Sequence, residues 1–210
     1  MTTVLILGAT GLVGQQLLQQ ALALPQVARV VAPTRRALAA QAKLDNPLVD
    51  FDQLPAANWW QADMVLCALG TTMKQAGSKA AFFKVDHDYV LAAAKLAQAA
   101  GTPVFVLNSS LGAKPDAGSY YLRVKGETER DLAALGFASL TLVRPSLLDG
   151  GPRPDSRPGE TIAICASKLF GRLLPRRVRP VTTAKVASAM LAAGLRATHG
   201  TTVLESEVLQ

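Results

Sequence analysis

The sequence predicts an α/β fold: a doubly wound parallel sheet with helices on both faces. Short apolar runs typical of buried strands alternate along the chain with longer segments of helical apolar spacing. The composition is 50% hydrophobic but only 5% aromatic, which suits aliphatic helices packed on a sheet. A length of 210 residues suits one core. We therefore expect a single domain over residues 1–210, with 149–210 forming a small lobe on the substrate side.

Each expected element follows from a local pattern. The first strand is the apolar run before Gly8, and the first helix keeps helical spacing until Pro25 ends it. Gly101 ends the long helix before the fifth strand, and the proline- and glycine-rich segment 149–160 predicts a loop. We expect strands at 3–7, 29–32, 48–51, 63–69, 104–107, 140–143 and 201–205, and helices at 12–24, 80–100, 119–135, 161–173 and 183–196. Ligands of such sheets bind beyond the carboxyl ends of the strands, so the residues there are the candidates for function.

The first of these strand ends is a glycine turn. The apolar run stops at Gly8, and Gly11 and Gly14 follow at three-residue intervals before the helix begins. A helix N-terminus offers unpaired backbone N–H groups and a partial positive charge, which suit a pyrophosphate. The alternative is an ordinary turn between a strand and a helix. The residues predicted to bind a dinucleotide here are Gly8, Thr10, Gly11, Leu12, Val13 and Gly14.

The turn after the second strand predicts the choice of dinucleotide. It carries Thr34, Arg35 and Arg36 and no carboxylate. A carboxylate would accept hydrogen bonds from the ribose 2′-hydroxyl of NAD(H), whereas a guanidinium pairs with a 2′-phosphate. We therefore expect NADP(H) rather than NAD(H). The alternative is that both arginines are simply solvated.

The third and fourth strands are followed by two further cofactor segments. Asp50 or Asp52 is expected at the adenine edge, although either is equally well explained as a solvated loop acid. The segment after the fourth strand contains small residues, which permit close approach to the pyrophosphate and ribose, and hydroxyls, which can donate hydrogen bonds. Its residues are Ala68, Leu69, Gly70 and Thr71.

The fifth strand leads to the residues that predict chemistry. Ser109 and Ser110 end it, and Tyr121 and Lys125 lie four residues apart on the next expected helix, on one face. A phenol titrates near 10, and a nearby ammonium lowers its pKa, so Tyr121 could exchange a proton with a carbonyl or alcohol. Ser110 could hold the same substrate oxygen. The alternative is that the tyrosine packs and the lysine is solvated.

The order of glycine turn, serine and Tyr-x-x-x-Lys resembles the short-chain dehydrogenase/reductase superfamily. The Gly8-x-x-Gly11-x-x-Gly14 spacing is similar to its extended and atypical branches. Four further segments resemble one atypical group, the oxidoreductases related to the human Tat-interacting tumour-suppressor protein. They are residues 67–72 (CALGTT), 85–91 (VDHDYVL), 121–127 (YLRVKGE) and 156–160 (SRPGE).

This resemblance implies a Rossmann-like domain that binds NADPH. It implies that Arg35 and Arg36 lie at the 2′-phosphate, and that Tyr121, Lys125 and Ser110 (or Ser109) form the active site. It also places Pro145, Ser146 and Leu147, after Arg144, beside the nicotinamide. Many relatives have glycine where this chain has Ser146, which puts the contact at that residue in doubt.

Charge and composition restrict the partners. The formal net charge of +7 suits a nucleic acid, an anionic membrane surface or a polyanionic small ligand. The basic residues are not interleaved with aromatics, so we expect no nucleic acid partner. No apolar run could span a bilayer, and no basic region precedes the first strand as in a signal peptide. Cys67 and Cys165 are far apart and lack metal-ligand spacing, which predicts a reducing compartment. We expect a cytoplasmic monomer or homodimer.

Two other features have uncertain roles. Asp86, His87 and Asp88 are consecutive, so they cannot all face one metal ion from a helix, and we expect no metal site. The basic segment Arg172–Arg179 follows an amphipathic stretch at 162–170. We favour a lid over the substrate side for this stretch, above a helix lying on a membrane.

These observations predict an NADPH-dependent oxidoreductase that reduces a carbonyl of a small molecule, with Tyr121 as the proton donor. The alternative is a regulatory protein that senses NADPH without turnover. The short chain after the sixth strand gives that alternative weight, because it leaves little room for a substrate domain. A sugar-nucleotide epimerase is a weaker third hypothesis, since those enzymes keep a larger C-terminal lobe.

Overall fold

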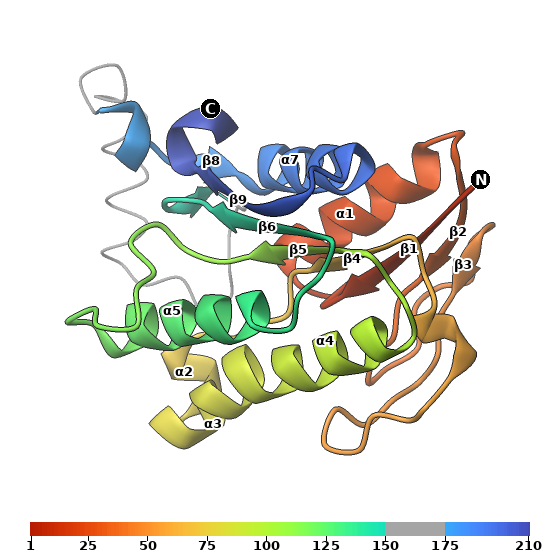
Figure 1. The fold of residues 1–210 in the computed structure, drawn as a ribbon, viewed down its shortest axis with the longest axis horizontal. Coiled ribbons are helices and arrows are strands. Elements are labelled where there is room, and N and C mark those ends of the chain that lie inside the picture. The colour runs from red at the N-terminus through yellow and green to blue at the C-terminus, as the bar shows by residue number, and fades with distance from the viewer. Residues whose placement is uncertain (150–174) are drawn as a thin grey trace.

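A computed structural model describes residues 1–149 and 175–210 and contains a seven-stranded parallel sheet (Figure 1). The strand order is β3-β2-β1-β4-β5-β6-β9, so the order reverses between β1 and β4. Such a switch point opens a crevice at the carboxyl ends of the strands, and the predicted fold class is confirmed. The strands are β1 (Thr2–Leu7), β2 (Val27–Val31), β3 (Leu44–Asp45), β4 (Met64–Cys67), β5 (Val104–Asn108), β6 (Ser139–Arg144) and β9 (Gly200–Glu205).

Helices cover both faces of this sheet (Figure 1). On one face α1 (Leu12–Ala23) packs beside α7 (Thr183–Arg196). The other face carries α4 (Tyr89–Ala99) and α5 (Tyr120–Ala133), with the short α2 (Met73–Ala76) and α3 (Lys79–Phe83) next to them. No helix in the described part of the chain is long and apolar enough to cross a membrane.

The two faces explain why the central strands are mostly apolar. Side chains alternate between faces along a strand, so Val4 and Ile6 enter the core under α1 and α7. Leu5 and Leu7 enter the core under α4 and α5, where Phe105 is also buried. A strand covered on both sides is therefore mostly apolar, and the buried polar side chains of β6, Ser139 and Thr141, are small.

The third predicted strand, at residues 48–51, is wrong. The ladder beside β2 is formed earlier in the chain, where the Ala32 N–H donates to the Asp45 carbonyl at 2.9 Å. Only Leu48 keeps a bridge, to Thr34, and its side chain is largely exposed. Phe51 is apolar for a different reason: its ring lies 5.7 Å from the ring of Tyr89 and is buried there.

The long helix expected at 80–100 is interrupted. Its middle turn, Lys84–Asp88, is a π-helix between α3 and α4. Such a turn inserts an extra residue into the helix and changes which side chains face the core, and it occurs often at functional sites.

The last part of the chain adds to the main sheet. β9 pairs with β6, and α7 packs on α1, so both belong to the sheet layers. A separate parallel pair joins β7 (Leu148–Asp149) to β8 (Val181–Thr182). The expected loop at 149–160 and helix at 161–173 lie almost wholly outside the described residues, and the expected lobe stays a prediction. Short 3-10 helices occupy Asn58–Trp60, Arg176–Val178 and Ser206–Leu209.

Candidate active site

The glycine turn joins β1 to α1 at the switch point. Gly8 has a φ of +81°, which favours glycine, and its carbonyl accepts the Gly11 N–H at 3.0 Å. A Cβ on Gly14 would lie 1.9 Å from that carbonyl oxygen, so only glycine allows this helix start. Gly11 caps α1 without a side-chain hydrogen bond, and the first turn has no acidic residue. The helix N-terminus is therefore open to an anionic ligand, which fits a dinucleotide pyrophosphate.

The loop after β4 lies against this turn. A Cβ on Gly8 would come within 2.6 Å of the Ala68 carbonyl oxygen, so the two backbones are in close contact. Further along the loop, the Thr71 N–H donates to Oδ2 of Asp86 at 2.7 Å. The segment Ala68 to Thr71 is thus held between the glycine turn and the π-helix.

The serines after β5 differ in burial. The Ser109 N–H continues the sheet by donating to the Val143 carbonyl at 2.7 Å, and its side chain is buried. Its hydroxyl has no hydrogen-bond partner among the described residues. Ser110 is half-buried, and the next residue, Leu111, donates its N–H to the Pro145 carbonyl at 2.8 Å. This bond brings the loops after β5 and β6 together.

Tyr121 and Lys125 both lie in the first half of α5, as predicted. The Tyr121 ring is 5.7 Å from the ring of Phe82. The Lys125 ammonium lies 2.8 Å from Oδ1 of Asp86, and these side chains are only 7% and 1% exposed. A Cβ on Gly70 would be 3.5 Å from that ammonium, so Lys125 lies under the loop after β4.

The charge of Lys125 is maintained by its surroundings. Burial lowers the pKa of its ammonium, but the carboxylate of Asp86, with weaker contributions from Tyr121 and Cys67, outweighs burial. The pKa of Lys125 is consequently raised above its ordinary value. Burial also raises the pKa of the Cys67 thiol to about 12, so this side chain is neutral.

Asp86 was not among the predicted site residues. A signal for it was present, because Phe82, Asp86 and Val90 are spaced four residues apart, and the outer two are core residues. An acid at the middle of an apolar helical stripe is expected to be buried and therefore paired.

The predicted 2′-phosphate residues lie beyond β2. Arg35 and Arg36 are exposed on a turn that Thr34 closes, because its hydroxyl donates to the Arg36 carbonyl at 2.7 Å. Asp50 is exposed, and its carboxylate accepts the Asp52 N–H at 2.9 Å. Asp52 itself forms an ion pair with a helix lysine, described below.

The loop after β6 contains Pro145, Ser146 and Leu147. The Ser146 hydroxyl donates to the carbonyl of Arg179, and its N–H donates to Oγ of Ser206 at 3.2 Å. The Ser146 side chain therefore ties the loop to the segment before β8, and its backbone ties the loop to the last 3-10 helix. Leu147 is 43% exposed.

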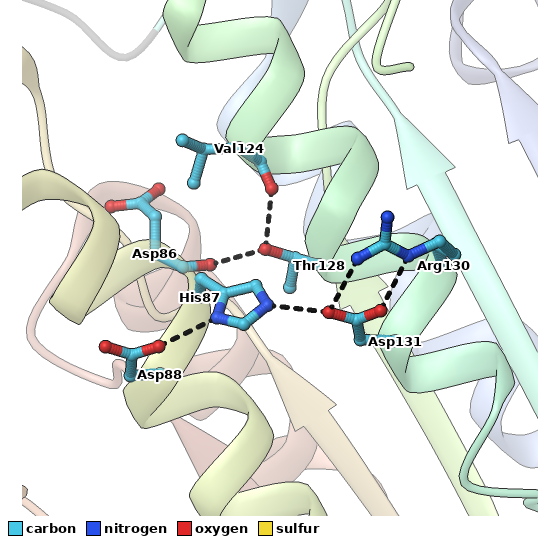
Figure 2. Close-up of polar contacts among 7 residues, drawn as sticks. All are labelled: Asp86, His87, Asp88, Val124, Thr128, Arg130 and Asp131. Atoms are coloured by element: carbon cyan, nitrogen blue, oxygen red, sulfur yellow. Dashed lines mark hydrogen bonds and ion pairs between the residues drawn. The ribbon is translucent and has the colours of Figure 1, made fainter. Parts of the chain in front are cut away.

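His87 belongs to a helix contact. One ring nitrogen bonds to Asp88 at 2.8 Å and the other to Asp131 of α5 at 2.9 Å (Figure 2). Arg130 is ion-paired with the same Asp131 carboxylate at 2.7 Å. Within residues 1–149 and 175–210, no group of three or more His, Cys, Asp or Glu side chains is arranged to hold a metal ion.

Several known proteins are similar to this chain in sequence. The NAD(P)H-binding family model matches residues 8–194. Protein HTATIP2 of Rattus norvegicus is 40% identical over 177 residues, which cover 81% of this chain and 71% of that protein. The mitochondrial protein fmp52 of Emericella nidulans is 38% identical over 183 residues, covering 82% of this chain and 78% of that protein.

Solved structures share the fold at low sequence identity. MoeE5 in complex with UDP-glucose and NAD has a TM-score of 0.72 at 17% identity, over 99% of this chain and 79% of that chain. The Bordetella bronchiseptica enzyme WbmH in complex with NAD+ has a TM-score of 0.70 at 18% identity, over 98% of this chain and 76% of that chain.

The relatives also correct one prediction. The expected cytoplasmic location is wrong by this comparison, because the fmp52 relatives from Emericella nidulans, Aspergillus terreus, Aspergillus clavatus and Aspergillus fumigatus are all named mitochondrial proteins. Widely separated cysteines indicate a reducing compartment in general, and they do not identify the cytoplasm.

Proposed function

The chain belongs to the NAD(P)H-binding family, within the atypical short-chain dehydrogenase/reductases, and from that membership we propose that it is an NADPH-dependent reductase of a small-molecule carbonyl. The observation that carries this proposal is the position of Lys125. Its ammonium lies under the loop after β4, and Tyr121 precedes it by one helical turn on α5. The mitochondrial names of the fmp52 relatives support a mitochondrial location for this chain as well.

Preference for NADPH rests on the turn after β2. Two exposed guanidinium groups follow Thr34, and no acidic residue occupies that turn. A 2′-phosphate pairs well with such groups, whereas a bare ribose hydroxyl gains little from them. Asp50 would then lie toward the adenine, and the open N-terminus of α1 would hold the pyrophosphate.

In the proposed reduction each active-site residue has a defined role. A bound NADPH supplies the hydride. The Tyr121 hydroxyl donates the proton that the carbonyl oxygen gains, and the Ser110 hydroxyl hydrogen-bonds the same oxygen. The Lys125 ammonium favours the phenolate that Tyr121 becomes, and donates to the nicotinamide ribose. Pro145, Ser146 and Leu147 would border the nicotinamide.

One observation favours a second function. The Lys125 ammonium is already paired with the Asp86 carboxylate, so its attraction for a Tyr121 phenolate is partly cancelled. A protein that binds NADPH as a regulatory ligand needs Lys125 for the ribose but needs no acidic tyrosine. An NADPH sensor without turnover is therefore the alternative.

Cofactor preference is tested by fluorescence titration with NADPH and NADH. In Arg35→Ala we expect the Kd for NADPH to rise about ten- to a hundredfold, the value of one charge-assisted contact, and the Kd for NADH to stay the same. Arg29→Ala is the matched control, because Arg29 is a nearby exposed arginine that pairs with Asp45. Equal affinity for both dinucleotides, unchanged in Arg35→Ala, would refute the 2′-phosphate assignment.

Turnover is tested with a panel of aldehydes and ketones, by following NADPH absorbance. For any substrate found, Tyr121→Phe should lower kcat about 10²- to 10⁴-fold while the Kd for NADPH stays within error. Tyr120→Phe is the control, because the Tyr120 hydroxyl donates to the Lys79 carbonyl instead. Retained turnover in Tyr121→Phe would refute the catalytic role. Tight NADPH binding with no consumption across the panel would support the sensor.

A further inference from the structure

We propose that Asp86 is a positioning residue, whose carboxylate holds the Lys125 ammonium and the loop after β4 in one fixed arrangement. The inference rests on the proposed function, in which Lys125 and this loop border the dinucleotide. Asp86 would act through these two groups and would not itself touch the substrate.

The two carboxylate oxygens of Asp86 have separate partners. Oδ1 lies 2.8 Å from the Lys125 ammonium, and Oδ2 accepts the Thr71 N–H at 2.7 Å. A Cβ on Gly70 would lie 3.0 Å from Oδ1, so the loop backbone lies directly against the carboxylate. One side chain thus connects an active-site cation to a cofactor loop.

The backbone of Asp86 is fixed from the same helix that carries Lys125. The Thr128 hydroxyl bonds to the Asp86 carbonyl at 3.0 Å and to the Val124 carbonyl at 2.8 Å (Figure 2). Asp86 lies within the π-helix, where the regular α-helical hydrogen bonds are interrupted. A carbonyl oxygen has two lone pairs, so the Asp86 carbonyl can accept the Thr128 hydroxyl, and this bond links the π-helix to α5.

The titratable groups around Lys125 come from three elements. Asp86 faces it from the π-helix, Tyr121 from its own helix α5, and Cys67 from the end of β4. The thiol is neutral, so Asp86 supplies the negative charge that keeps a buried ammonium protonated. An ammonium has three N–H donors, so its ion pair with Asp86 leaves it able to serve a ribose as well.

The first test measures the protonation of Lys125 directly. In protein labelled with [¹³C]lysine, Lys125→Arg assigns the signal, which is then followed from neutral to alkaline pH. We expect the wild-type signal to stay in its charged position beyond about pH 10.4, where exposed lysines titrate. In Asp86→Asn we expect its midpoint to fall by at least about one unit, a tenfold change in the acid dissociation constant. A wild-type midpoint at or below that of the exposed lysines, or an unchanged midpoint in Asp86→Asn, would overturn the proposal.

The second test measures whether the protonation of Lys125 affects the binding of NADPH. NADPH affinity should be nearly independent of pH in the wild type. In Asp86→Asn it should weaken at least tenfold as pH rises through the lowered midpoint, because the ribose contact loses its charge. Asp88→Asn is the matched control, since Asp88 lies on the same π-helix but is exposed and pairs with His87. Equal NADPH affinity of Asp86→Asn and wild type at every pH would overturn the positioning role.

The two tests separate the possible failures. If the wild type binds no NADPH, the proposed function fails, while the Lys125 titration still decides the role of Asp86. If Asp86→Asn does not fold, Asp86→Glu decides, because it keeps the charge but moves the carboxylate. We then expect a Lys125 midpoint like that of the wild type and an NADPH affinity about three- to tenfold weaker, as about 1 kcal/mol of lost alignment would give. Unchanged affinity in Asp86→Glu would count against the proposal.

Discussion

Two lysine–aspartate pairs involve the π-helix, and they are almost equally close. Lys84 lies 2.6 Å from Asp52, and Lys125 lies 2.8 Å from Asp86. Their surroundings differ: the first pair has side chains about half exposed, at 51% and 47%, whereas the second pair is almost fully buried. From these distances alone, the two pairs would be expected to contribute equally to stability.

Burial determines what each pair does. An exposed pair exchanges contacts with water for a contact with its partner, and the net gain is small. A buried pair has lost its water entirely, so each charge depends on the other, although an apolar pair of the same shape could be as stable. We therefore expect the buried pair to hold a charge at a fixed position. The exposed pair adds only minor stability to the loop that carries Asp50.

The largest loss of stability should come from breaking the buried pair. Asp86→Ala leaves the Lys125 ammonium and the Thr71 N–H without their acceptor, so we expect the free energy of unfolding to fall by about 3–5 kcal/mol. Urea denaturation at neutral pH measures this. Asp52→Ala, in the exposed pair, should leave the denaturation midpoint within error. Similar losses in the two variants would mean that burial does not distinguish the pairs.

A smaller loss of stability should come from removing the hydrogen bond to the Asp86 carbonyl. Thr128→Val keeps the side-chain shape but removes the hydroxyl that bonds to the Asp86 carbonyl. Loss of this buried hydrogen bond should cost about 0.5–1.5 kcal/mol in the same urea assay. Thr201→Val, on the exposed side of β9, is the control. A loss in Thr128→Val no larger than in the control would indicate that water replaces the hydroxyl.

High salt should reduce the coupling energy of the exposed pair more than that of the buried pair. At about 1 M salt the screening length falls to about 3 Å, so the coupling between Lys84 and Asp52 in a double-mutant cycle should shrink toward zero. Coupling between Lys125 and Asp86 should persist, because solvent ions do not reach the pair. If the coupling of the buried pair fell in proportion to that of the exposed pair, water would have to enter the site.

The smallest effect is the pH dependence of the exposed pair. Lys84, and then the Tyr89 hydroxyl, lower the pKa of Asp52 below its ordinary value of 3.8. Stability from this carboxylate is therefore present above that value and is lost as pH falls through the lowered pKa. The small Tm difference between wild type and Asp52→Asn should be constant from about pH 5 to 8 and should vanish in stronger acid. A difference that grew on acidification would contradict this sign.

Much of the fold could be predicted because it depends on local patterns. β1, β5 and β6, together with α1, α5 and α7, lie within a few residues of the predicted ranges, since apolar runs, helical spacing and glycine or proline ends identify them. The third strand could not be found in this way. Two residues, Leu44 and Asp45, pair with β2, and so short a strand has no periodicity of its own.

For the candidate site, local sequence was enough to predict the glycine turn, the arginines after β2 and the spacing of Tyr121 and Lys125. These are short-range features, set by backbone sterics and by the helical repeat. Three other features depend on how the chain packs: Lys125 is buried, Asp86 is its counterion, and the Ser146 hydroxyl reaches the carbonyl of Arg179. Such contacts join segments far apart in the chain, and their strength depends on the exclusion of water, which exists only once the two faces of the sheet are covered.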